Sequence, residues 1–135
     1  IIPWDRLEPY GHADGMVRYI GNDKVLITNY YDFDKGLRKK LLDALQSHFE
    51  VVELHYDTPR PHKWNWAYIN YLLTDGKLFL PRLNVPEDEQ ACAQIGSALG
   101  IPREHIELVD ITGVLRNGGG LNCISWNVSL YDSIL

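Results

Sequence analysis

The sequence is poor in cysteine, in positive charge and in long apolar runs, and each shortage excludes a class of protein. Of 135 residues only two are cysteine, too few for a disulfide scaffold, so we expect a reduced, cytoplasmic protein. The net charge of −5 argues against nucleic acid or an anionic membrane as a partner. No apolar run reaches the roughly 20 residues that span a bilayer. The chain starts at Ile1 rather than Met, which leaves room for an upstream signal peptide.

The composition that is present is that of one globular domain. Hydrophobic residues make up 45% and charged residues 23% of the chain, which is ordinary for a folded domain. The length suffices for one hydrophobic core. We therefore expect residues 1–135 to form a single domain.

The order of the predicted elements repeats along the chain. Turn residues and apolar periodicity predict a strand, a turn, a second strand, a helix that begins near Asp34, and a third strand. In the first unit these lie at residues 16–20, 21–23, 24–28, 34–48 and 51–54. In the second unit the strands lie at 67–73, 77–80 and 106–109, the turn at 74–76 and the helix at 86–99.

This repeat predicts an α/β fold made of strand, strand, helix, strand units. A third unit is predicted to open with a strand at residues 123–126. One such unit cannot bury both faces of its sheet, so the units must pack on one another. A propeller-like ring of units and a two-layer α/β sandwich both fit, and from the residues alone we favour the sandwich.

Two short segments contain residue types that are common in catalytic and ligand-binding sites. In the first, Gly11 and Gly15 flank His12 and Asp14, whose side chains point the same way if the segment is extended. Flanking glycines let a ligand come close. The alternative is a surface or capping histidine.

The second segment is a run of three glycines at residues 118–120, followed by Cys123. Consecutive glycines are costly in backbone entropy, and a loop whose backbone lies against a ligand would justify them. Cys123 then lies at a loop-to-strand junction. The alternative is a flexible linker followed by a buried strand cysteine, as we expect for Cys92 within its helix.

A cysteine with a distant histidine and carboxylate is typical of nucleophilic catalysis. Residues 11–15 resemble the G-H-x-D segment of agmatine deiminases and bacterial-type peptidylarginine deiminases of the pentein superfamily. Residues 67–71 and 77–81 resemble their Y-x-N-F strand and the strand that ends in proline. Residues 118–123 resemble their G-G-G…C loop, and the three segments occur in the family's order.

The resemblance implies a pentein-like α/β propeller, here a partial ring of about two ββαβ units plus part of a third. Residues 1–135 would be the C-terminal part of a longer catalytic domain. The implied activity is hydrolytic deimination of a small-molecule or peptide guanidine substrate, of the agmatine, arginine or peptidyl-arginine type. No metal and no cofactor would be needed.

The resemblance also implies roles for individual residues. Cys123 would attack the guanidinium carbon and form a thiouronium intermediate, and His12 would protonate the leaving ammonia and activate water. Asp14 would hold the guanidinium nitrogens by paired, charge-assisted hydrogen bonds. We also expect substrate binding by the loop and by nearby polar and aromatic side chains, namely Gly119, Gly120, Asn70 and Trp126. For Asn70 and Trp126 the alternative is ordinary structural packing.

The chain departs from the family pattern in ways that keep other functions open. The family uses two further acidic residues upstream of G-H-x-D, and neither Asp5 nor Glu8 has the required spacing. Asn122 stands where agmatine deiminases usually have histidine, and the step from the glycines to the cysteine is one residue shorter. We expect a missing upstream segment or another chain to complete the ring. The alternatives are a related amidinotransferase, a non-catalytic pentein-type binding module and a truncated inactive relative.

Overall fold

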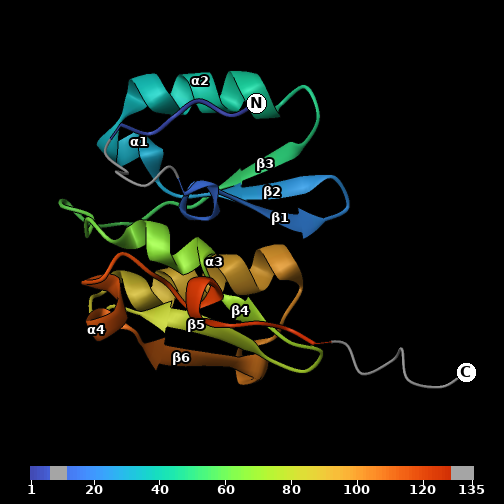
Figure 1. Cartoon of the computed structure of the whole chain (residues 1–135), viewed down its shortest axis with the longest axis vertical. Helices are drawn as coiled ribbons and strands as arrows, with labels where there is room; N and C mark the ends of the chain where they lie inside the picture. The colour runs from blue at the N-terminus through green and yellow to red at the C-terminus, as the bar shows by residue number, and fades with distance from the viewer. Residues whose placement is uncertain (7–11, 129–135) are drawn as a thin grey trace, which may run out of the picture.

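The computed structural model describes residues 1–6 and 12–128, which form two small three-stranded sheets. The first sheet has the order β1 (Val17–Gly21), β2 (Lys24–Ile27), β3 (Glu50–Glu53), and the second has β4 (Leu72–Leu73), β5 (Leu78–Arg82), β6 (Ile106–Asp110). In each sheet the first pair of strands is antiparallel and the second pair is parallel. Figure 1 shows the first unit, coloured blue to green, beside the second, coloured yellow to orange. The mixed α/β class and the repeated strand order are confirmed, whereas the propeller ring stays a prediction.

A helix connects the parallel strands in each unit. In the first unit this is α2 (Lys35–Leu45), and in the second it is α3 (Glu87–Leu99). The described residues also form the short helices α1 (Tyr30–Phe33) and α4 (Thr112–Leu115) and four 3₁₀ turns, η1 (Ala13–Gly15), η2 (Asn65–Ile69), η3 (Arg103–His105) and η4 (Asn122–Ile124). Within the described residues, no helix is long and apolar enough to cross a membrane.

The central strand β2 contributes side chains to two hydrophobic clusters. Side chains alternate between the two faces of a strand. Val25 and Ile27 pack with Leu41 of α2, whereas Leu26 packs into the cluster that the second unit forms around Tyr68 and Leu80. All three strand residues are buried, because the helix covers one face of the sheet and the second unit covers the other.

Helix α2 begins where the sequence predicts. The Asp34 carboxylate accepts a hydrogen bond from the backbone N–H of Leu37 at 2.8 Å, which caps the helix. Leu37, Leu41 and Leu45 follow at helical spacing and are buried. The helix ends at Leu45, three residues earlier than the predicted residue 48.

We expect Asp34→Ala to lower the free energy of unfolding by about 1 kcal/mol, because the N–H of Leu37 loses its acceptor. Asp43→Ala is the matched control, since Asp43 lies in the same helix and its carboxylate makes only an exposed ion pair with Lys39. That control should cost less than about 0.5 kcal/mol. Urea denaturation of both variants measures the difference, and equal losses would contradict the capping role.

Helix α3 also agrees with its prediction. It ends at Leu99, and Gly100 follows with a left-handed φ of 66°, a conformation that favours glycine. Ala91, Cys92 and Ile95 are buried on its inner face. Cys92 is 1% exposed, so the expectation of a core cysteine is confirmed.

The strand predicted at residues 67–73 is wrong over most of its length. Its first part belongs to the 3₁₀ turn η2, and only Leu72–Leu73 form a strand. Ala67, Tyr68 and Ile69 are consecutive and all fully buried. Such a continuous apolar run does not distinguish a strand from a buried turn, because neither alternation nor helical periodicity is visible in it.

The strand predicted at residues 123–126 is also wrong. Asn122–Ile124 form the 3₁₀ turn η4, and Ser125 is the first residue after it with an extended backbone. Cys123 therefore lies in a turn rather than at the start of a strand. The remainder of the expected third unit, residues 129–135, lies outside the described residues, as do Gly11 and Glu8.

Candidate functional site

The fold brings the predicted cysteine and carboxylate together from opposite ends of the chain. Asp14 lies in η1, directly before β1, and Cys123 lies in η4. The Cys123 thiol donates a hydrogen bond to the Asp14 carboxylate, with Sγ 3.4 Å from Oδ2. Cys123 is exposed and free. The site therefore combines an accessible thiol with an adjacent carboxylate, and the catalytic roles of the two residues stay predictions.

Asn70 connects these two side chains. It follows η2 and is fully buried. Its Nδ2 donates to Asp14 Oδ2 at 2.8 Å, while its Oδ1 accepts from the Asn122 N–H at 3.0 Å and from Cys123 Sγ at 3.5 Å. A buried amide with these bonds fixes the relative positions of the carboxylate and the thiol. The predicted substrate-binding role of Asn70 stays a prediction.

The glycine loop packs against the same asparagine. An ideal Cβ on Gly120 would lie 2.3 Å from Asn70 Oδ1, so no larger residue fits beside that side chain. An ideal Cβ on Gly119 would meet nothing closer than 3.6 Å. Packing inside the protein is therefore one reason for a glycine at position 120. Substrate contacts by Gly119 and Gly120 remain predictions.

The surroundings of Asp14 hold it in its charged form. Partial burial alone would raise the pKa of its carboxyl group. Hydrogen bonds from Asn70, Cys123 and Asn122, together with the charge of His12, outweigh burial and lower that pKa below its ordinary value of 3.8. A charged carboxylate beside an exposed thiol is suited to hold a cation above the sulfur.

This shift predicts how stability depends on pH. Because the folded state lowers the pKa of Asp14, the charged carboxylate stabilises the fold above the unfolded pKa, and this contribution is lost as pH falls through the folded pKa. The difference in free energy of unfolding between wild type and Asp14→Asn should therefore shrink between about pH 6 and about pH 2.5. Urea denaturation at both pH values measures this difference. A difference that stays constant or grows in acid would contradict the lowered pKa of Asp14.

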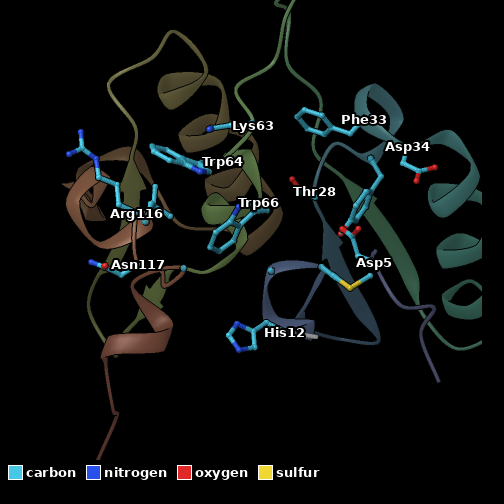
Figure 2. Close-up of a pocket in the computed structure, with 15 residues that line it drawn as sticks. Asp5, His12, Thr28, Phe33, Asp34, Lys63, Trp64, Trp66, Arg116 and Asn117 are labelled. Carbon is cyan, nitrogen blue, oxygen red and sulfur yellow. The ribbon is translucent and has the colours of Figure 1, made fainter. Parts of the chain in front are cut away.

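His12 lies at the edge of a neighbouring cavity. It is exposed, and its charge acts on Asp14. The cavity has a volume of about 750 Å³ and adjoins the glycine loop at Gly118. Asp14 and Cys123 do not line it, so the cavity and the thiol–carboxylate cluster adjoin at His12 and Gly118 and do not coincide. Figure 2 shows His12 at the lower side of this cavity.

Aromatic and charged side chains from both units form the cavity walls. Trp64 and Trp66 lie on one side, and Phe33 and Asp34 face them from the other (Figure 2). The sequence predicts Trp126 as a substrate-binding residue, but Trp126 is 88% exposed and does not line the cavity. Its substrate-binding role stays a prediction, while Trp64 and Trp66 line the same cavity as His12.

Three residues at the site were not assigned a role from the sequence. Asp5, set aside for its spacing, is buried, accepts a hydrogen bond from Tyr30 at 3.1 Å and lines the cavity. Asn122 donates to Asp14 Oδ2 at 3.4 Å, and Arg18 bonds to Asn122. No sequence pattern marks Arg18, which lies within a strand of ordinary composition. No group of three or more metal-ligating side chains occurs in residues 1–6 and 12–128.

Comparison with known proteins identifies the family to which the chain is similar. A family model described as Porphyromonas-type peptidyl-arginine deiminase matches residues 5–128. No curated protein matches.

Several solved structures are similar in fold. A variant agmatine deiminase of C. jejuni with substrate bound has a TM-score of 0.65 and 22% identity, over 84% of this chain and 35% of that one. An agmatine deiminase of Enterococcus faecalis has a TM-score of 0.62 and 17% identity, over 84% and 39%. SxtG, an amidinotransferase of the saxitoxin pathway from Microseira wollei, has a TM-score of 0.57 and 15% identity, over 92% and 33%.

These structures show the fold, and the chain spans between 33% and 39% of their lengths. The family model covers nearly the whole chain, including Asp14, Asn70 and Cys123. The chain belongs to the Porphyromonas-type peptidyl-arginine deiminase family.

Proposed function

We propose that these 135 residues form part of a hydrolytic guanidine deiminase in which Cys123 is the nucleophile. The observation that carries the proposal is the contact of 3.4 Å between the exposed Cys123 thiol and the charged Asp14 carboxylate. Membership of a deiminase family supports it. The substrate class is a guanidinium of the agmatine, arginine or peptidyl-arginine type.

Asp14 binds and orients the substrate in this proposal. A guanidinium is planar and offers N–H donors on a fixed edge, which a carboxylate accepts in pairs. Asn70 holds Asp14 at 2.8 Å, so the carboxylate is positioned before substrate arrives. Binding the cation beside Cys123 favours the thiolate over the thiol. Substrate binding and activation of the nucleophile are thus coupled.

The covalent step follows from this arrangement. The thiolate forms a C–S bond with the guanidinium carbon, and one C–N bond breaks as His12 gives its proton to the leaving nitrogen. Ammonia departs and a thiouronium remains on Cys123. His12 then takes a proton from water, whose oxygen attacks the same carbon, and the C–S bond breaks to release the ureido product. The sum is one guanidinium and one water converted to one urea group and one ammonium ion.

An amidinotransferase is the second candidate, favoured by the fold similarity to SxtG over 92% of this chain. The covalent intermediate would be the same, and an amine would replace water in the second half. The two candidates differ in product. A deiminase releases a ureido compound, whereas a transferase gives a new guanidine on the acceptor amine.

The test measures products from agmatine, free arginine and an arginine peptide, each with and without an acceptor amine. The proposal predicts ammonia and a ureido product in equal amounts, with turnover abolished by Cys123→Ala. Amidine transfer in place of hydrolysis would favour the second candidate. No reaction with any guanidine, by the protein that contains these residues in its natural form, would refute both and leave a binding module.

We expect the 135-residue chain by itself to show little or no turnover. A delocalised guanidinium needs contacts on both sides before a thiolate can attack it, and Asp14 supplies one side. The family also uses an acidic residue that orients the histidine, and loss of such a carboxylate lowers kcat by about 10⁴ in the serine-protease triad. Ammonia release by the 135-residue chain and by the natural protein measures the difference. Equal turnover would show that residues within this chain supply the contacts on the other side of the guanidinium. Asp5 would be the first of them to test.

A further inference from the structure

We propose that Arg18 is a positioning residue that fixes the orientation of Asn122 and thereby holds Cys123 against Asp14. This inference rests on the proposed function and adds a residue to it. Arg18 lies in β1 of the first unit, while Asn122 and Cys123 lie in η4 after the second unit. The guanidinium Nη1 of Arg18 donates to Asn122 Oδ1 at 2.9 Å across 104 positions of sequence.

The Arg18 guanidinium is held in place by a second contact. Its Cζ lies 4.7 Å from the centre of the Tyr71 ring, in a cation–π arrangement. Tyr71 is 1% exposed, and it follows directly after Asn70. Burial raises the pKa of the Tyr71 hydroxyl, and the charge and hydrogen bond of Arg18 act in the opposite direction. Arg18 thus connects β1 to the segment that follows η2, through Tyr71, and to η4, through Asn122.

Asn122 lies between a cation and an anion. Its Oδ1 accepts from Arg18 at 2.9 Å, and its Nδ2 donates to Asp14 Oδ2 at 3.4 Å. The two ends of an amide have nearly the same shape, so hydrogen bonds decide which way it points. Without Arg18, Oδ1 loses its donor at 2.9 Å, and the longer contact of Nδ2 with Asp14 at 3.4 Å is left to hold the side chain. The turn η4 is then held less firmly beside Asp14.

The consequence for Cys123 follows from the peptide bond it shares with Asn122. The Asn122 N–H donates to both the backbone oxygen of Asn70 at 3.1 Å and its Oδ1 at 3.0 Å, which anchors the turn. The Cys123 contacts are longer, at 3.4 Å and 3.5 Å, and depend on where that turn lies. A displacement of about 1 Å can lower a reaction rate by about 100-fold. Arg18 therefore acts on the chemistry through Asn122 without touching the substrate.

The test is a double-mutant cycle of Arg18→Met with Asn122→Ala, measured in the natural protein. We expect Arg18→Met to lower kcat by about 100-fold with KM changed less than about threefold. In the Asn122→Ala background the same substitution should have almost no further effect, because the route through Asn122 is already lost. Arg18→Lys, which keeps the charge, should recover part of kcat. Fully additive losses would overturn the proposal.

A second readout does not depend on turnover. Hydrogen exchange of the Asn122 amide should be at least about 10-fold faster in Arg18→Met, because the turn opens more often. Arg38→Met is the matched control: Arg38 makes a bidentate pair with Glu53 at 2.7 Å, away from the site, and its loss should leave this amide unchanged. Unchanged exchange in Arg18→Met overturns the proposal. Faster exchange in a protein that converts no guanidine supports Arg18 while refuting the deiminase assignment.

Discussion

Gly120→Ala is expected to lower the free energy of unfolding by about 3 kcal/mol or more, the largest loss of stability among the substitutions considered. The added Cβ would lie 2.3 Å from Oδ1, 2.7 Å from Cγ and 2.9 Å from Cβ of Asn70. Asn70 is fully buried and bonded to Asp14, Asn122 and Cys123, so it has no space to move into. Relief requires breaking these bonds or displacing the loop. Urea denaturation measures the loss.

Gly119→Ala is the matched control for this prediction. Its Cβ would meet atoms at 3.6 and 3.7 Å, which is ordinary van der Waals contact. We expect it to change stability by less than about 1 kcal/mol. In an Asn70→Ala background, which removes the two shortest contacts, Gly120→Ala should cost much less than in wild type. If Gly120→Ala is as stable as Gly119→Ala, the packing of the loop against Asn70 is not as described.

Cys123→Ala is expected to lower turnover of a guanidine by about 10⁴-fold or more, as loss of a nucleophile does in other covalent enzymes. The protein should remain folded, because the Cys123 side chain is exposed and carries no core packing. Ammonia release per folded molecule measures the effect, with circular dichroism as the check on folding.

Cys92→Ala is the control that separates nucleophile loss from general damage. Cys92 is 1% exposed in the core, where burial raises the pKa of its thiol. Its replacement should lower stability by about 1 kcal/mol and leave activity per folded molecule unchanged. A Cys123→Ala protein that turns over at the wild-type rate, or a Cys92→Ala protein that is folded and inactive, would contradict the assignment of Cys123.

The elements that could be predicted are those with a clear local signal. Helices α2 and α3 have apolar residues at helical spacing together with Asp34 at one start and Gly100 at one end, and both were predicted to within three residues. The run at residues 67–69 has no such periodicity, and tertiary packing of Tyr68 and Ile69 decides its turn conformation. Local pattern is a weak guide where every side chain is buried.

The residues of the site also separate into those that a sequence motif predicts and those that only the folded structure brings together. The resemblance supplied Asp14 and Cys123, and the structure places them in contact. It did not supply Arg18, whose interaction with Asn122 spans 104 positions and leaves no pattern in either segment. It also did not supply the packing of Gly120 against the Asn70 side chain. Contacts made only by folding cannot be read from spacing.

The central claim is that Asp14 holds a planar cation over Cys123, and a pair of alkylating reagents tests it directly. Chloroacetamidine carries the planar cation, and chloroacetamide is its neutral analogue of the same shape. In both reactions the thiolate forms a C–S bond and displaces chloride. Intact-protein and peptide mass spectrometry give the rate at Cys123, with the buried Cys92 as an internal control.

The informative quantity compares two alkylation rates of Cys123. The rate with chloroacetamidine is divided by the rate with chloroacetamide, and this ratio is divided by the same ratio for free cysteine. A charge-assisted hydrogen bond contributes about 1.5–3 kcal/mol, so this quotient should exceed about 10 in wild type. Asp14→Asn should return it to about 1. A wild-type quotient that equals that of free cysteine, or one that Asp14→Asn leaves unchanged, would contradict the account.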